Sequence, residues 1–345
     1  MLGRLRSLYH PERFHYHDEL ERGGGQFEGW YFKIVDAAGS QPYAVIPGVF
    51  LGEDRHAFIQ ILDGRAGTAH YHRFPLDAFR ASRHALELEI AGSRFSGEGV
   101  DLDLDGASDG TGQRVEGSLR FSAWRPWPVT TLSPGVMGPY GFIPFMECNH
   151  GILSVDHAVE GTLSVDGRTT SFDGGRGYAE KDWGRAFPSG YVWTQSNHFD
   201  REGISITASV ARIPWLSGAF RGFLVGFLCA GELHRFTTYT GAEIESLTID
   251  DSHVRLRLRD RHHRLEIDAR KAEGGVLHAP YERQMIERVG EAMDSEIDLR
   301  FSRRATDETL YEGRGRHACL EVQGDLPSIL DGLGTEAQRS ASRSG

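Results

Sequence analysis

Short runs of alternating residues, separated by glycine-rich breaks, are the feature that most constrains this fold. Residues 115–123 alternate small or apolar side chains with Glu, Ser and Arg, and residues 204–210 and 254–259 repeat the pattern. Alternation with a period of two gives a β-strand two different faces. The chain has 43 glycines, and the one candidate helix, over residues 282–293, is weakened by Gly290. The sequence therefore predicts an all-β chain of antiparallel strands.

Four short matches recur in the same order along the chain and suggest a tandem duplication. Residues 29–31 resemble 190–193, 52–58 resemble 231–236, 88–90 resemble 265–267, and 119–122 resemble 299–302. The last three pairs are separated by 177 to 180 residues. Repeated units of this length predict two antiparallel barrels that share an interface. We place the barrels at residues 20–165 and 166–327, divided near the Asp166-Gly167 turn, and expect a disordered tail over 328–345.

Composition and charge narrow the class of protein. The chain has 38 Lys and Arg against 49 Asp and Glu, for a net charge of −11, and its basic residues are scattered. This distribution argues against a nucleic-acid partner. Its three cysteines have no metal-knuckle or disulfide spacing, and no leader or membrane-spanning segment is evident. These features lead us to expect a cytoplasmic protein.

Candidate acids occur in two segments. Glu28 shares one strand face with Trp30 and Phe32, so it would lie in an apolar lumen if that face points inward. Desolvation raises the pKa of a carboxyl and makes it a usable general acid near neutral pH. The alternative is that Glu28 pairs with a neighbouring Arg.

The second segment, residues 180–199, gathers acids, amides and indoles. An extended backbone sends Glu180 and Asp182 to one side and Lys181 and Trp183 to the other. Two neighbouring carboxyls can share a proton, which leaves one of them protonated. The alternative is a buried polar network that ties the two barrels together.

Two further features bear on ligands. Residues 126–157 form an aromatic segment that is too rich in Pro and Gly over 126–144 for regular structure, and such a loop either lines a cavity or closes a barrel end. His pairs at 15–17 and 70–72 share strand faces, but most such pairs are solvated edge residues. We expect no metal and no cofactor.

Four segments resemble the tocopherol cyclase family: FEGWYFKIVD at 27–36, HAFIQILDG at 56–64, the loop at 127–157, and GYAEKDWGRAFPSGYVWTQSNHF at 177–199. The likeness extends from about residue 25 to about residue 325. It implies a lipocalin-like two-barrel fold with a ligand cavity near the junction of the halves. It also implies a reaction without a cofactor, in which a prenylated benzoquinol closes to a chromanol.

The resemblance implies roles for particular residues. An acid protonates the trisubstituted alkene of the prenyl tail, and the phenolic oxygen captures the tertiary cation. Four carboxyls are candidates for the acid, and aromatic and polar side chains would bind the substrate. The catalytic candidates are Glu180, Asp182, Glu147 and Glu28; the substrate-binding candidates are Trp30, Phe145, Met146, His150, Trp183, Trp193, Gln195 and Asn197.

Three points stay open at this stage. Relatives of similar fold hydrate or cyclise other polyenes, and a lipid, quinone or carotenoid carrier could use the same cavity without chemistry. The family pattern has Asn where this chain has Asp182, so the acid pair could belong to a subgroup. The expected partner is a hydrophobic small molecule, with a peripheral membrane contact as a possible loading route and the oligomeric state undetermined.

Overall fold

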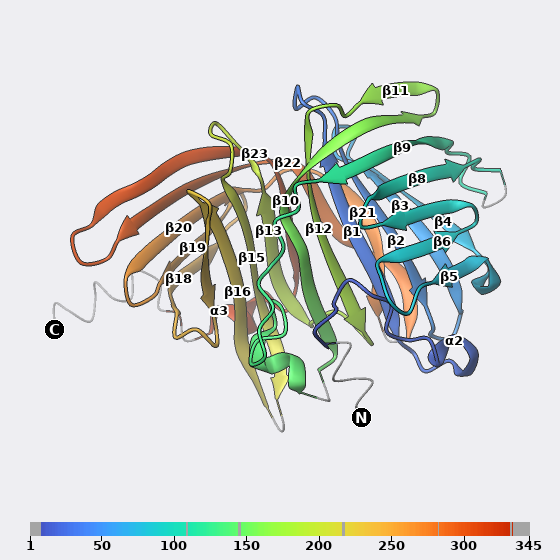
Figure 1. The fold of residues 1–345 in the computed structure, drawn as a ribbon. Helices are drawn as coiled ribbons and strands as arrows, with labels where there is room; N and C mark the ends of the chain where they lie inside the picture. The colour runs from blue at the N-terminus through green and yellow to red at the C-terminus, as the bar shows by residue number, and fades with distance from the viewer. Residues whose placement is uncertain are drawn as a thin grey trace. The chain divides into compact units, whose positions relative to one another are not determined.

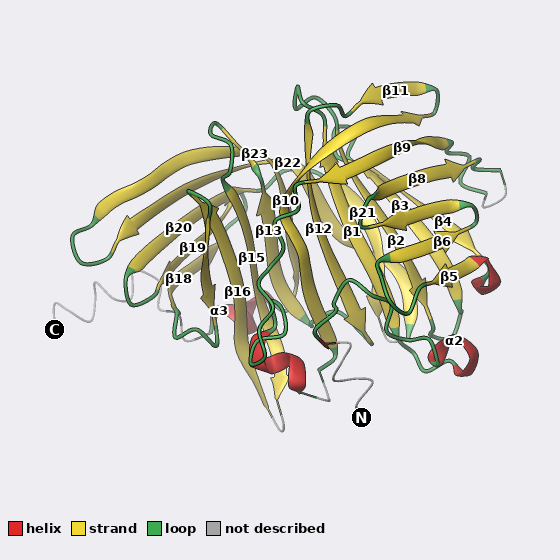
Figure 2. Ribbon diagram, viewed as in Figure 1, coloured by secondary structure: helices red, strands yellow, loops and turns green. Residues whose placement is uncertain are grey.

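The computed structural model describes residues 8–107, 110–143, 146–215, 218–281, 283–331 and 333. These residues are almost entirely in antiparallel strands, so the all-β prediction is confirmed (Figure 2). They form two compact units. The first unit runs to Phe187 and includes Gly274–Val289; the second contains Pro188–Glu273 and the chain from Gly290 onward.

The first unit is a lipocalin-like sheet of 12 strands whose path is β4-β3-β2-β1-β12-β10-β9-β8-β7-β6-β5 (Figure 1). Its strands are β1 (Phe27–Val35), β2 (Pro42–Phe50), β3 (His56–Asp63), β4 (Thr68–Phe74), β5 (Phe79–Ala81), β6 (Glu87–Ile90), β7 (Ser93–Ser96), β8 (Gly99–Leu104), β9 (Val115–Ser122), β10 (Cys148–Val165), β11 (Arg168–Ser171) and β12 (Gly175–Gly184). Its short helices are α2 (Glu19–Arg22), η1 (Leu76–Ala78) and η2 (Gly138–Phe142). The first strand thus pairs with the last one.

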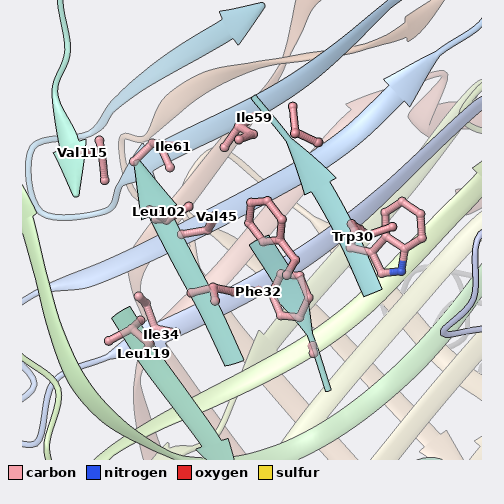
Figure 3. Packing of buried hydrophobic residues seen from close by; sticks show 14 of the residues in the cluster. Trp30, Phe32, Ile34, Val45, Ile59, Ile61, Leu102, Val115 and Leu119 are labelled. Carbon is pink, nitrogen blue, oxygen red and sulfur yellow. The ribbon is translucent and has the colours of Figure 1, made fainter. Parts of the chain in front are cut away.

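One face of this sheet encloses an apolar core (Figure 3). On β1 the core residues are Trp30, Phe32 and Ile34, which alternate along the strand as the sequence predicts. Figure 3 shows them packed with side chains such as Val45 from the neighbouring strand β2. The hydrophobic effect therefore fixes which face of β1 and β12 is the inner one, and the residues between them lie on the outer face.

The second unit is built on a sheet of 11 strands, with the path β17-β16-β15-β13-β23-β22-β20-β19-β18. Its strands are β13 (Gly190–Ser196), β14 (His198–Phe199), β15 (Ser205–Trp215), β16 (Gly218–Cys229), β17 (Glu232–Thr237), β18 (Glu243–Ile249), β19 (His253–Arg259), β20 (His263–Arg270), β22 (Gln284–Arg303) and β23 (Glu308–Gly324), with α3 (Leu326–Leu330) after them. Strand β21 (Gly275–Tyr281) pairs with β22 and belongs to the first unit.

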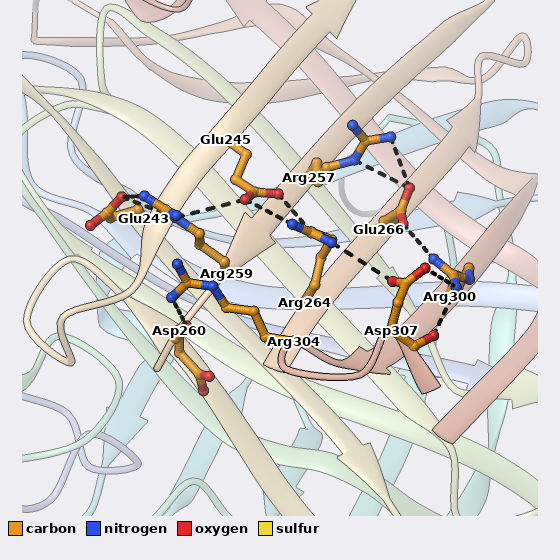
Figure 4. A network of polar contacts seen from close by, with 10 residues as sticks. All are labelled: Glu243, Glu245, Arg257, Arg259, Asp260, Arg264, Glu266, Arg300, Arg304 and Asp307. Carbon is orange, nitrogen blue, oxygen red and sulfur yellow. Dashed lines mark hydrogen bonds and ion pairs between the residues drawn. The ribbon is translucent and has the colours of Figure 1, made fainter. Parts of the chain in front are cut away.

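Ion pairs cover the outer face of β18, β19 and β20 (Figure 4). Arg257 contacts Glu266 at 3.0 Å, and Arg264 contacts Glu245 at 2.8 Å. A groove on this side of the sheet is lined by Arg257 and Arg300, both of which already pair with Glu266. Exposed pairs of this kind contribute little stability each, and charged strands resist unwanted pairing with other chains.

Several expectations differ from the structure. The units divide after Phe187 rather than at residue 165, because β12 pairs with β1 and β10 in the first sheet. The candidate helix at 282–293 falls mostly within β22, because pairing with β23 overrides its local periodicity. Part of the expected tail, from residue 328, lies in α3, and residues 334–345 lie outside the described residues.

The two sheets share their wiring, because each begins with a meander and pairs its first strand with its last, β1 with β12 and β13 with β23. The sequence match at Gly29 and Gly190 falls on or beside these equivalent first strands. The match at Leu119 and Leu299 does not, because β9 lies three strands from β1 and β22 lies only two strands from β13. The near-constant spacing therefore misaligned the strands.

Candidate functional site

Strand β12 presents three polar side chains on its outer face. Its register with β1 is unbroken from Phe27 opposite Gly184 to Val35 opposite Arg176. Strict alternation therefore holds, and Tyr178, Glu180 and Asp182 lie on one side while Lys181 and Trp183 lie on the other. The expected shared face of the two acids is present.

His150 lies between these two acids. It belongs to β10 and is directly opposite Asp182 in the register, while Ile152 is opposite Glu180. The Nδ1 atom of His150 is 2.9 Å from Oδ1 of Asp182, and its Nε2 atom is 3.6 Å from Oε2 of Glu180. One imidazole thus faces a carboxylate with each of its nitrogens, an arrangement suited to proton exchange.

Tyr178 and Cys148 complete the cluster, and neither was identified from the sequence. The Tyr178 hydroxyl donates a hydrogen bond to Oε2 of Glu180. The Cys148 Sγ lies 3.9 Å from Oδ1 of Asp182. Burial, together with the Asp182 carboxylate, raises the pKa of the Cys148 thiol well above its usual value, so it remains a neutral thiol. Tyr178 could have been found, because it lies two residues before Glu180 on the same alternating face.

The burial of the cluster is graded. Glu180 is 5% exposed and Tyr178 is fully buried, whereas the Asp182 side chain is 26% exposed. Donor atoms of His150, Glu180 and Asp182 lie within 4.8 Å of one another, so their spacing would also suit a divalent cation. A cation would require one ring nitrogen and both carboxylates to turn toward one point, whereas the present rotamers direct a different nitrogen to each carboxylate.

Glu28, Trp30 and Trp183 form a separate arrangement on the inner face of the sheet. Glu28 is fully buried and forms an ion pair with Lys181, and it accepts the His15 backbone N–H at 3.0 Å. The Lys181 ammonium lies 4.7 Å from the ring centre of Trp30 and 4.8 Å from that of Trp183. The two indoles therefore already hold a cation that the protein itself supplies.

This arrangement changes the expected roles of these residues. Burial raises the pKa of Glu28, but the Lys181 ammonium and the His15 amide oppose that effect and stabilise the carboxylate. Burial likewise lowers the pKa of Lys181, against the opposing field of Glu28. The partner of Glu28 is a lysine rather than the arginine considered from the sequence. We therefore interpret this pair as structural and do not carry Glu28, Trp30 or Trp183 into the proposed chemistry.

The remaining candidates of the first unit lie at the start of β10. Glu147 is exposed, and a solvated carboxyl lacks the desolvation that would keep it protonated. Met146 is half-buried. Phe145 lies outside the described residues. Of the four candidate acids, Glu180 and Asp182 are the ones that His150 brings together.

Trp193, Gln195 and Asn197 belong to the second unit, and all three are buried. Trp193 and Gln195 lie on one face of β13, whereas Asn197 follows the end of the strand. Trp193 is opposite Glu321 of β23, whose carboxylate accepts the Tyr191 hydroxyl at 2.6 Å. This neighbour was not identified from the sequence, because cross-strand partners 128 residues apart leave no local signal.

Residues 119–324 match the family model described as tocopherol cyclase-like. This match covers more than half of the chain and includes His150, Glu180 and Asp182. The chain belongs to the tocopherol cyclase-like family. Glu28 and Trp30 lie outside the matched residues, whereas the outer-face cluster lies within them.

Curated relatives and solved structures agree with this family. The chain is 27% identical over 157 residues to a probable chloroplastic tocopherol cyclase of Oryza sativa subsp. japonica, covering 44% of this chain and 33% of that protein. It is 26% identical over 191 residues to the chloroplastic tocopherol cyclase of Zea mays, covering 52% and 40%. The matches thus span less than half the length of these relatives.

A crystal structure of CghA with Sch210972 has a similar fold, with a TM-score of 0.55 at 12% identity over 87% of this chain and 89% of that one. A second crystal structure of CghA gives the same TM-score, with 90% of each chain covered. At this identity the likeness concerns the fold alone. Within the described part of the chain, no helix has the length and apolar character needed to cross a bilayer.

Proposed function

We propose that this protein is an acid catalyst that cyclises a prenylated aromatic alcohol, such as a prenyl-benzoquinol, and that Glu180 is the proton donor. One observation carries the proposal: the buried Glu180 carboxyl is held between the Tyr178 hydroxyl and His150, whose other ring nitrogen is bonded to Asp182. Membership of the tocopherol cyclase-like family supports the choice of substrate class.

The proposed reaction is an isomerisation that conserves every atom. The Glu180 carboxyl transfers its proton to the less substituted carbon of the alkene, and the electron pair of the double bond forms the new C–H bond. The phenolic oxygen then bonds to the tertiary cation and releases its proton to a carboxylate. The ring closes without an oxidant, a reductant or a second substrate.

The neighbours of Glu180 have complementary roles in this scheme. A hydrogen bond from Tyr178 stabilises the carboxylate that remains after proton transfer. Asp182 orients His150 so that Nε2 faces Glu180, from which position it can return a proton to that carboxyl. Asp182 is therefore a positioning residue rather than the donor.

Activity of purified variants on a prenyl-benzoquinol tests these roles, with the chromanol quantified by chromatography. Glu180→Gln should lower kcat by about 10²- to 10⁴-fold, the range expected for loss of a general acid. Asp182→Asn should lower kcat less, by roughly tenfold, and should change the pH profile, because the orientation of His150 depends on it.

Glu147→Gln is the matched control, because Glu147 is an exposed acid at the start of β10; it should retain full activity. Full activity in Glu180→Gln would refute the assignment of the donor. If the wild-type protein instead releases the quinol unchanged, the protein would be a carrier and the proposal would fail.

A further inference from the structure

The loop before β10 exposes apolar side chains in a long stretch without charge. Residues 126–146 contain no Asp, Glu, Lys, Arg or His, although a quarter of the whole chain is charged. Five large hydrophobic side chains are exposed among the described residues, and three of them, Val129, Leu132 and Phe142, lie in this loop. Leu132 is 79% exposed. Apolar exposure of this kind in one segment marks an interaction surface.

The tip of the loop is a defined turn. Thr130 and Ser133 exchange two backbone hydrogen bonds, from Thr130 N to Ser133 O at 2.9 Å and from Ser133 N to Thr130 O at 3.1 Å. This closed turn projects Thr131 and Leu132 outward. The Leu132 side chain is thus held in solvent by an ordered backbone.

Tyr9 joins the tip to the rest of the apolar surface. Its hydroxyl donates a hydrogen bond to the Thr131 carbonyl at 2.8 Å, and its ring centre lies 6.4 Å from that of Phe142. The bond from Tyr9 satisfies a carbonyl at the very tip of the turn. Residues 128 and 134, which flank the tip, are prolines and have no N–H group that needs a partner.

These features match what a bilayer requires of an inserted segment. Within lipid, an unpaired backbone polar group or a charged side chain is costly, and an apolar side chain is favoured. We propose that the Val129–Leu132 turn, together with Phe142, inserts into the surface of a lipid bilayer. An aqueous protein partner would not require the absence of charge over 21 residues. The inference does not depend on the cyclisation proposed above.

Sedimentation with phosphatidylcholine vesicles tests this proposal on the full chain. The wild-type protein should pellet with the vesicles, and its binding should be the same at low and high salt, because the tip has no charge. Leu132→Glu should reduce the partition coefficient by about tenfold or more. The matched control is Val276→Glu, because Val276 is 50% exposed on β21, and it should bind as the wild type does.

Three results would overturn the proposal. The wild-type protein could stay in the supernatant at every lipid concentration, or Leu132→Glu could bind vesicles as well as the wild type. Alternatively, light scattering without lipid could show that Leu132→Glu dissociates a dimer, and the wild type could fail to bind vesicles; the tip would then be a contact between two copies. Activity on detergent-solubilised quinol should persist in Leu132→Glu, which separates this proposal from the catalytic one.

Discussion

Lys181 is fully buried between two indoles and the carboxylate of Glu28, on the inner face of the first sheet. Its ammonium also donates a hydrogen bond to the carbonyl of Arg13, in the segment that precedes β1. A buried ion pair gains little net stability over a well-packed apolar pair, but removing one partner leaves an uncompensated charge. The pair therefore makes folding of the first unit depend on both side chains.

This dependence predicts a strongly non-additive double-mutant cycle. Glu28→Gln should lower the free energy of unfolding by about 3–5 kcal/mol, because the Lys181 charge is left without its partner. Lys181→Met in the Glu28→Gln background should recover part of this loss. Urea denaturation of the wild type, both single variants and the double variant measures the coupling. Additive losses would show that the two side chains act independently.

His157 is the other unusual residue of the inner face. It is 2% exposed and stacks on Trp124 with ring centres 4.7 Å apart. Neither ring nitrogen of His157 has a hydrogen-bond partner among the described residues. Burial lowers its pKa from 6.5 to about 3, so the imidazole is neutral in the folded protein at physiological pH.

The sign of this shift predicts acid lability. The unfolded chain takes up a proton at His157 below pH 6.5, whereas the folded chain does so only near pH 3. Stability is therefore complete above pH 6.5 and falls as the pH decreases toward 3, by about 2 kcal/mol at pH 5. His157→Phe should lose about that much less stability between pH 7.5 and 5 in urea denaturation. Equal losses in both proteins would contradict the assignment.

At the scale of elements, Gly184 sets how closely the end of β12 approaches β10. Its φ is 157°, and a Cβ added there would lie 2.0 Å from the carbonyl oxygen of Glu147. That oxygen belongs to backbone, so it cannot move aside as a side chain would. Because Gly184 is opposite Cys148 in the register, any separation would propagate toward His150 and Asp182.

Gly184→Ala should therefore destabilise the protein by about 1–3 kcal/mol, as overpacking does, and should also reduce activity on a prenyl-benzoquinol. Gly97→Ala is the control, because a Cβ there meets no atom within 4 Å. Thermal denaturation and activity of both variants check the prediction. A Gly184→Ala protein as stable and active as Gly97→Ala would show that the strand ends can separate freely.

Alternation along β12 predicted much of the site and also limited what could be predicted. It placed Glu180 and Asp182 on one face and Lys181 and Trp183 on the other, because strand periodicity is a local property. It did not identify which face is the core, so Trp30 and Trp183 were taken for substrate contacts. The pairing of β12 with β1 joins residues about 150 positions apart, and such pairing depends on long-range packing that no local pattern reports.

At the scale of the whole molecule, two sheets of the same wiring form the two units, and the family match runs through both of them. The duplication was correctly anticipated as a pair of β-units, but the division came 22 residues later than expected. A Gly-rich turn near residue 166 is a sound local signal for a break. It was misleading here because the strand after it, β12, completes the first sheet.

The central claim is that the chain delivers a proton from Glu180 to a carbon of the substrate. Incubation of the wild-type protein with a prenyl-benzoquinol in D₂O, followed by mass spectrometry of the product, tests it most directly. The proposal predicts a chromanol with one deuterium bound to carbon, formed at least about 100-fold more slowly by Glu180→Gln. A chromanol without deuterium, or equally fast labelling by Glu180→Gln, would contradict it.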